Sequence, residues 1–170
     1  MFPVLLFSLL ILQQAPAKDS LAGATNVTRV DATVMCGGAT SAEAYPELKR
    51  RGFVSVISLR REQEPGADIP AAKAAASDAG LKYIHIPLDP AAITDADVEA
   101  FLRAVADTAN QPVYIHCASA NRVGAMWLIK RVVIDGWELP RATDEAVTIG
   151  LTNPALKQFA TDYATAHRRK

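Results

Sequence analysis

The chain alternates between β-branched apolar runs and helix-like segments, and this alternation constrains its fold more than any other feature. Strand-like runs lie at residues 27–35, 53–59, 83–86 and 113–115. Helices are predicted between and after them, at 40–52, 70–79, from 94, 122–134, 138–149 and from 153. Strands that alternate with helices favour a parallel sheet covered on both faces. We therefore predict an α/β fold with a mostly parallel sheet flanked by helices.

Local start and stop signals support these boundaries. Thr40 followed by Glu43 is typical of a capping box, and the helix that it opens is expected to close at Gly52. Gly80 ends the next predicted helix, and Thr94 begins the one after it. In parallel sheets, ligands bind beyond the carboxyl ends of the strands. Functional residues are therefore expected where these strands end.

Length and charge exclude several classes of function. The 170 residues suit one domain, and 18 basic side chains balance 18 acidic ones. A net charge of zero gives no electrostatic basis for binding nucleic acid or an anionic membrane. Residues 2–12 are almost all apolar but too few to span a bilayer, and Ala15-Pro16-Ala17 resembles a cleavage site. We predict a signal peptide over residues 1–17 and an exported domain over 18–170, periplasmic or secreted and free of the membrane.

The chain has two cysteines, Cys36 and Cys117. They could form one disulfide in an oxidising compartment, or Cys36 could act as a second, resolving thiol. The alternative for Cys36 is a small buried apolar side chain. No further Cys or paired His lies near His116 and Cys117, so no zinc site is predicted. Nothing in the sequence calls for a metal or an organic cofactor.

The strongest chemical signal is the segment that joins the strand 113–115 to the helix 122–134. The strand runs directly into His116 and Cys117, and Arg122 follows at the helix start. Backbone N–H groups at a helix start attract an anion and favour a thiolate. A guanidinium can hold an oxyanion against that sulfur. This interpretation requires that Cys117 and Arg122 share a pocket that a substrate can reach.

This segment resembles the loop of the protein tyrosine and dual-specificity phosphatase superfamily. The whole chain resembles one bacterial branch, the phosphatase-like domain associated with beta-lactamase-hydrolase-like proteins. The resemblance extends over Gly37-Gly38, Val56-Ile57-Ser58-Leu59-Arg60, Ile84-His85-Ile86-Pro87 and His116-Cys117…Asn121-Arg122-Val123-Gly124. It implies a dual-specificity type of topology. It also implies Cys117 as nucleophile, Arg122 as oxyanion clamp, His116 as a supporting residue, and an anion-binding loop of Ala118, Ser119, Ala120, Asn121 and Arg122.

The loop departs from that superfamily in three ways. Four residues, not five, separate Cys117 from Arg122; the loop has no glycine before Gly124; and Val123 replaces the usual Ser or Thr. The four-residue spacing is similar to that of rhodanese-type sulfurtransferases. Sulfur transfer needs a thiolate and a cradle but no acid for an alkoxide. The sequence therefore favours transfer of sulfane sulfur, for example from thiosulfate, to a small thiol acceptor.

Two alternatives remain open. The first is phosphoester hydrolysis through a phosphocysteine, in which Asp89 would be the general acid. Asp89 is equally well explained as a turn residue beside Pro90. The second alternative is a non-catalytic module that binds a small oxyanion. Arg60, at a strand end, could extend the anion site or belong to a solvated charged loop.

Overall fold

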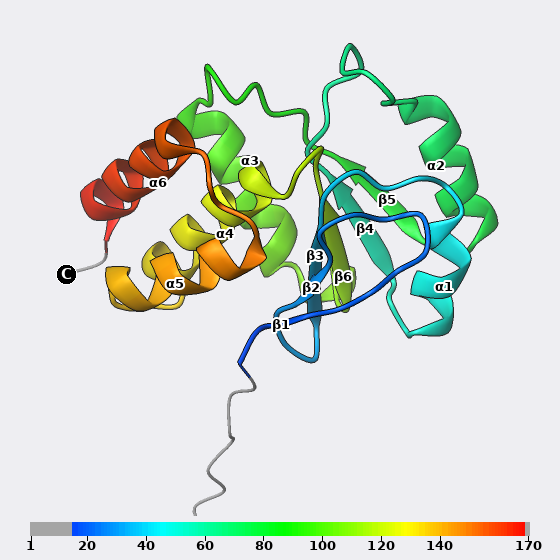
Figure 1. Cartoon of the computed structure of the whole chain (residues 1–170), viewed down its shortest axis with the longest axis horizontal. Coiled ribbons are helices and arrows are strands. Elements are labelled where there is room, and N and C mark those ends of the chain that lie inside the picture. The colour runs from blue at the N-terminus through cyan, green and yellow to red at the C-terminus, as the bar shows by residue number, and fades with distance from the viewer. Residues whose placement is uncertain (1–14, 169–170) are drawn as a thin grey trace, which may run out of the picture.

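The computed structural model describes residues 15–168, which build one six-stranded sheet with helices on both faces (Figure 1). The strand order is β1-β2-β3-β6-β4-β5. Strands β3, β6, β4 and β5 are parallel neighbours, whereas β1 and β2 join antiparallel at one edge. The prediction of an α/β fold with a mostly parallel sheet is confirmed.

The strands are β1 (Ala17–Lys18), β2 (Thr28–Arg29), β3 (Val34–Gly37), β4 (Ser55–Ser58), β5 (Lys82–His85) and β6 (Val113–His116). The helices are α1 (Ala44–Arg50), α2 (Ile69–Asp78), α3 (Asp95–Ala106), the 3₁₀ turn η1 (Thr108–Asn110), α4 (Asn121–Val133), α5 (Leu139–Ile149) and α6 (Pro154–His167). The predicted helices and the strands at 53–59, 83–86 and 113–115 are thus confirmed to within a few residues.

Side chains that alternate along β6 divide the core into two parts. Tyr114 packs with the cluster under α1 and α2, and Ile115 packs with the cluster under the other helices. In Figure 1, α1 and α2 cover one face of the sheet, and α3 to α6 cover the other. Because successive side chains on a strand point to opposite faces, His116 belongs to the α1–α2 side and Cys117 to the α4 side.

The strand predicted at 27–35 is wrong in one respect, because the structure divides it into β2 and β3. Asp31 turns the chain between them: its Oδ1 accepts the backbone N–H of Thr33 at 2.8 Å and of Val34 at 2.9 Å. An aspartate that bonds its own downstream backbone makes a tight turn. The β-branched residues on either side therefore form two antiparallel strands.

The capping box predicted at Thr40 and Glu43 is also wrong. Helix α1 begins at Ala44 without a side-chain cap, and the Thr40 hydroxyl bonds the Gly38 carbonyl and the Tyr114 hydroxyl. At Thr94 the cap does form, because Asp97 reaches back to the Thr94 backbone N–H at 2.9 Å.

The predicted leader falls almost entirely on residues 1–14, outside the described part of the chain. Ala17, at the predicted cleavage position, pairs with Arg29 in the short β1–β2 ladder. Within residues 15–168, no helix has the length and apolar character needed to cross a bilayer.

Candidate active site

Cys117 directly follows the central strand β6 and precedes helix α4. Strands β3 and β4 pair with β6 on either side, and the Cys117 N–H donates to the Gly37 carbonyl of β3 at 3.3 Å. This is the carboxyl edge of the parallel strands, where the sequence placed the nucleophile. The Cys117 residue is fully buried, with no exposed surface. The expectation of a reachable sulfur is therefore not met in this closed arrangement.

The loop from Ala118 to Asn121 is braced from outside. The Asn26 side-chain amide donates to the Ser119 carbonyl at 3.1 Å, which turns this carbonyl outward. The Asn121 Oδ1 accepts the backbone N–H groups of Thr152 at 2.8 Å and Asn153 at 2.7 Å. Ala118 and Ser119 are exposed. The loop is therefore fixed by segments before β2 and after α5, which no local sequence pattern reveals.

Ala120 adopts a left-handed backbone, with φ of 70°, immediately before α4. This conformation favours glycine, and the sequence offers none in the loop. Gly150 makes room for it, because a Cβ at Gly150 would lie 2.9 Å from the Ala120 Cβ. The loop therefore keeps its turn in spite of the missing glycine.

Arg122 is buried beside Cys117. Its Nη1 donates to the Leu59 carbonyl at 2.9 Å and the Leu88 carbonyl at 2.8 Å, and its two Nη atoms hold both Glu64 oxygens at 2.5 and 2.7 Å. Burial lowers the pKa of Arg122, but the Glu64 hydrogen bonds and the nearby Cys117 sulfur raise it more. Among the described residues, no oxygen accepts from its Nε. Arg122 thus contacts Cys117, and neither its Nε–H nor its second Nη2–H donates to a described oxygen.

Glu64 is the functional residue that the sequence analysis missed. Its side chain is 12 % exposed and lies between two arginines, Arg122 and Arg60. Burial raises its pKa, but hydrogen bonds from Arg122 and its other neighbours lower the pKa to about 2. The one feature of the sequence that could have pointed to Glu64 was its place in the charged segment after the strand 53–59.

Arg60 neither extends the anion site nor faces solvent. It is 6 % exposed, and its guanidinium donates to Glu64 at 3.3 Å, the Pro65 carbonyl at 2.6 Å and the Gly66 carbonyl at 3.3 Å. We conclude that Arg60 is a positioning residue, which folds the segment 60–66 so that Glu64 reaches Arg122.

Asp89 lies on the loop after β5 with 43 % of its side chain exposed. Its Oδ2 accepts from Arg61 at 2.7 Å, and its Oδ1 accepts the backbone N–H of Ala91 at 3.0 Å. Both oxygens are acceptors, which fits the turn-residue alternative. The carbonyl of the preceding residue, Leu88, accepts a hydrogen bond from Arg122, so Asp89 is next in the chain to a residue that contacts Arg122.

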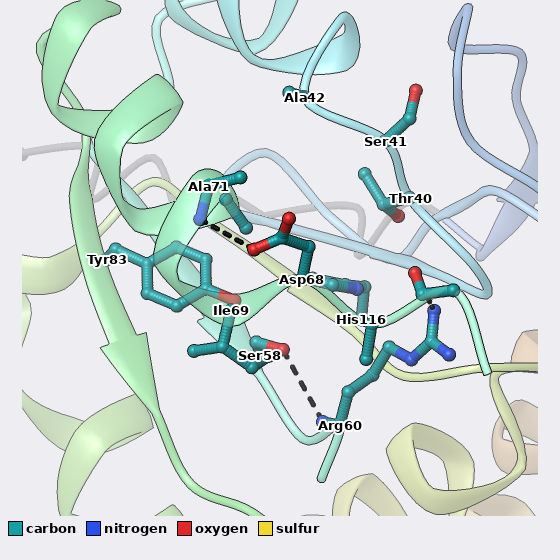
Figure 2. A pocket seen from close by; sticks show the side chains of 13 residues that line it. Thr40, Ser41, Ala42, Ser58, Arg60, Asp68, Ile69, Ala71, Tyr83 and His116 are labelled. Atoms are coloured by element: carbon teal, nitrogen blue, oxygen red, sulfur yellow. Dashed lines mark hydrogen bonds between the residues drawn. The ribbon is translucent and has the colours of Figure 1, made fainter. Parts of the chain in front are cut away.

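His116 lines a cavity on the α1–α2 side of the sheet (Figure 2), and strand alternation directs Cys117 to the other side. Its ring stacks on Tyr114, with centroids 5.8 Å apart, and neither ring nitrogen makes a hydrogen bond of normal geometry with a described residue. Burial lowers its pKa to about 4, although the backbone of Cys117 and Gly38 slightly favours the protonated ring. His116 is therefore neutral near pH 7, and its expected support of the loop involves no such bond.

Cys36 lies inside the sheet, paired in register with Ile115, and both cysteines are free. The register puts Gly37 opposite His116, so Cys36 is displaced from Cys117 by two residues along the strands. This separates their Cα atoms by roughly 8 Å, beyond the range of a disulfide. Burial raises the pKa of Cys36 well above its usual range. These observations favour the alternative of a buried apolar residue over a resolving thiol.

A cysteine on the β6–α4 loop beside a buried arginine fits a cysteine-dependent phosphatase-like domain. Residues 13–159 match the family described as "DSP-PTPase phosphatase fused to NAD+ Kinase". The chain belongs to this family, which confirms the resemblance to the phosphatase superfamily.

Curated relatives and solved structures agree with that assignment. Beta-lactamase hydrolase-like proteins from Xylella fastidiosa and Agrobacterium fabrum are 35 % and 32 % identical over 114 and 103 residues, or 65 % and 59 % of this chain. The aligned parts span only 26 % and 24 % of those proteins.

Three solved structures share the fold. A DUF442 protein from Shewanella putrefaciens superposes with a TM-score of 0.72 at 20 % identity, covering 86 % of this chain and 94 % of that one. P. aeruginosa TpbA in complex with pTyr superposes with a TM-score of 0.65 at 22 % identity, covering 86 % of this chain and 91 % of that one. The catalytic core of the S. cerevisiae PP-IP phosphatase SIW14 with citrate superposes with a TM-score of 0.69 at 21 % identity, covering 85 % of this chain and 88 % of that one. No comparison supports the sulfurtransferase prediction.

Proposed function

We propose that this protein hydrolyses phosphate monoesters through a Cys117 phosphocysteine. The observation that carries the proposal is the buried Cys117–Arg122–Glu64 arrangement at the carboxyl end of β6. Glu64 occupies the two Nη atoms of Arg122, and the Nε edge remains for a phosphoryl oxygen. Membership of a phosphatase family adds independent support.

The reaction has two steps. The Cys117 thiolate attacks phosphorus, so that an S–P bond forms while the P–O bond to the leaving group breaks. The departing oxygen takes a proton, for which Asp89 is the candidate donor once its pair with Arg61 opens. Water then attacks phosphorus, so that a new P–O bond forms while the S–P bond breaks. A water proton returns to the Asp89 carboxylate, inorganic phosphate leaves and the Cys117 thiolate is regenerated.

Arg122 stabilises both transition states through charge-assisted hydrogen bonds to the equatorial oxygens. Because Cys117 is sealed in the closed arrangement, substrate entry requires movement of a covering segment. The segment 60–66 is the candidate, since it carries Glu64 and contacts Arg122.

The substrate class follows from the site and its relatives. A buried guanidinium beside a cysteine suits a dianionic phosphoryl group, and TpbA was solved with pTyr. An aryl phosphate is therefore the first substrate to test.

Cys117→Ser should lower turnover of an aryl phosphate by at least about a thousandfold, as removal of a nucleophile does. Cys36→Ser is the matched control and should retain activity. Wild-type protein should form a phosphocysteine that intact mass spectrometry detects on Cys117. If Cys117→Ser remains active, the proposal is wrong. If wild type turns over no phosphate ester but gains one sulfur from thiosulfate, the chemistry is sulfur transfer instead.

A further inference from the structure

A cavity of about 200 Å³ lies on the opposite side of the β6 end from Cys117. Side chains from the β4 and β6 ends, from β5 and from the start of α2 surround it (Figure 2). The backbone of His116 and Cys117 separates it from the sulfur, since their side chains point to opposite faces of the sheet. It is therefore distinct from the phosphoryl site.

Two polar side chains in this cavity make no hydrogen bond of normal geometry with a described residue. The His116 ring is 2 % exposed, and neither of its nitrogens has a hydrogen bond of normal geometry within the described residues. The Tyr83 hydroxyl is also buried without a hydrogen bond of normal geometry, although the nearby Ser58 side chain acts to lower its pKa. A buried polar group without a partner costs about 1–3 kcal/mol. A ligand that supplies the missing hydrogen bonds would recover that cost.

The charges around the cavity select against an anion. Arg60 lines it, but its guanidinium is already bonded to Glu64 and to the Pro65 and Gly66 carbonyls. The Asp68 carboxylate lies at the rim and accepts the Ala71 N–H at 2.9 Å, which uses a backbone donor at the α2 start. Arg60 is the one cationic side chain among the described lining residues, and its charge is paired with the Glu64 carboxylate. The remaining groups both donate and accept, as hydroxyl groups require.

One wall is apolar, because Ile69, Ala71 and Ala72 of α2 line the cavity, whereas Thr40 and Ser41 add hydroxyl groups on another side. The volume is several times that of one water molecule, about 30 Å³, and smaller than the pocket of a drug-sized ligand. We infer that this cavity is a binding site for an uncharged, hydroxyl-bearing ring, with His116 and Tyr83 as its hydrogen-bond partners and α2 as its apolar wall.

The test is an NMR titration of the isotope-labelled full chain with phenol, glucose and inorganic phosphate. Phenol or glucose should shift the His116 ring signals saturably, together with signals from Tyr83 and the α2 start. Inorganic phosphate should leave the Tyr83 and α2 signals in place. The proposal is overturned if neither neutral probe shifts His116, or if a crystal soaked with both shows only ordered water in the cavity.

Variants keep this test independent of His116, whose replacement could impair folding. Ala71→Leu fills the cavity from an exposed helical position and should weaken binding at least tenfold. Ala74→Leu, exposed one turn further along α2 and outside the cavity, should not change it. Tyr83→Phe should weaken binding about three- to tenfold, as loss of one hydrogen bond does. Undiminished binding in Ala71→Leu would place the probe elsewhere and overturn the assignment.

Because binding is measured without turnover, this result is separate from the phosphatase test. Wild-type protein could bind phenol and hydrolyse no phosphate ester, which would defeat the proposed function alone. Active enzyme with no neutral ligand in the cavity would defeat the inferred site alone. Ala71→Leu and Tyr83→Phe should retain aryl phosphatase activity without added probe.

Discussion

The two sides of the β6 end differ in how their polar groups are satisfied. On the Cys117 side, Arg122 and Glu64 bond each other and the surrounding carbonyls, and the side is closed. On the His116 side, the imidazole borders an open cavity and has no partner of normal geometry in the described chain. The consecutive residues His116 and Cys117 therefore belong to two sites on opposite sides of the sheet. One side is organised in advance for a charged group, and the other retains unused hydrogen-bonding capacity.

The largest expected effect comes from Glu64→Gln, which breaks the closed side. Loss of the carboxylate leaves the buried Arg122 charge without its partner, and such losses cost about 3–5 kcal/mol. Chemical denaturation should show this decrease, and kcat/KM for an aryl phosphate should fall about a hundredfold because Arg122 loses its orientation. Glu62→Gln, on an exposed neighbour, is the control. Equal stability of the two variants would show that Glu64 does not hold the site together.

The second prediction concerns His116 and the dependence of folding stability on pH. The pKa of His116 in the folded protein is about 4, below its usual 6.5. The unfolded chain therefore binds the proton more tightly, and folding stability present above pH 6.5 is lost as pH falls toward 4. The difference amounts to about 3 kcal/mol. Denaturation curves across this window should decline less steeply for His116→Gln than for wild type, whereas the exposed control His167→Gln should follow wild type.

A smaller effect is expected at Val123, on the closed side. A hydroxyl at this position would assist departure of the sulfur from phosphocysteine, and Val123 has none. Val123→Thr should raise the rate of phosphocysteine breakdown about tenfold, which corresponds to about 1.4 kcal/mol. Single-turnover kinetics measure this step. Val132→Thr, a buried valine elsewhere on α4, controls for the cost of burying a hydroxyl. An unchanged breakdown rate would mean that water attack needs no such hydroxyl here.

The smallest effect is expected at Ala120. Its left-handed backbone costs about 1 kcal/mol relative to glycine, so Ala120→Gly should stabilise the protein by up to about that amount. Ala118→Gly has no positive φ to relieve and should destabilise slightly through added freedom of the unfolded chain. The denaturation midpoints of the two variants, each compared with wild type, measure these stability changes. If both variants lose stability equally, the loop is not strained at Ala120.

The sequence predicts the alternating elements well because their signals are local. Periodicity placed α3, and its capping box at Thr94 and Asp97 formed as such spacing allows. The same spacing misled at Thr40, whose hydroxyl bonds Tyr114, distant in sequence but brought close by the sheet. Cys117 and Arg122 were visible because they share one loop. Glu64 was not, since it meets Arg122 only through the packing of separate segments.

The triad of Arg60, Glu64 and Arg122 has a consequence for how the empty enzyme is built. Two guanidinium groups share one carboxylate away from bulk water, so the resting protein shelters a surplus positive charge. In the proposed mechanism, the thiolate of Cys117 would balance this single charge, because it lies against Arg122. The same cluster that orients Arg122 would therefore also favour the anionic form of the Cys117 sulfur.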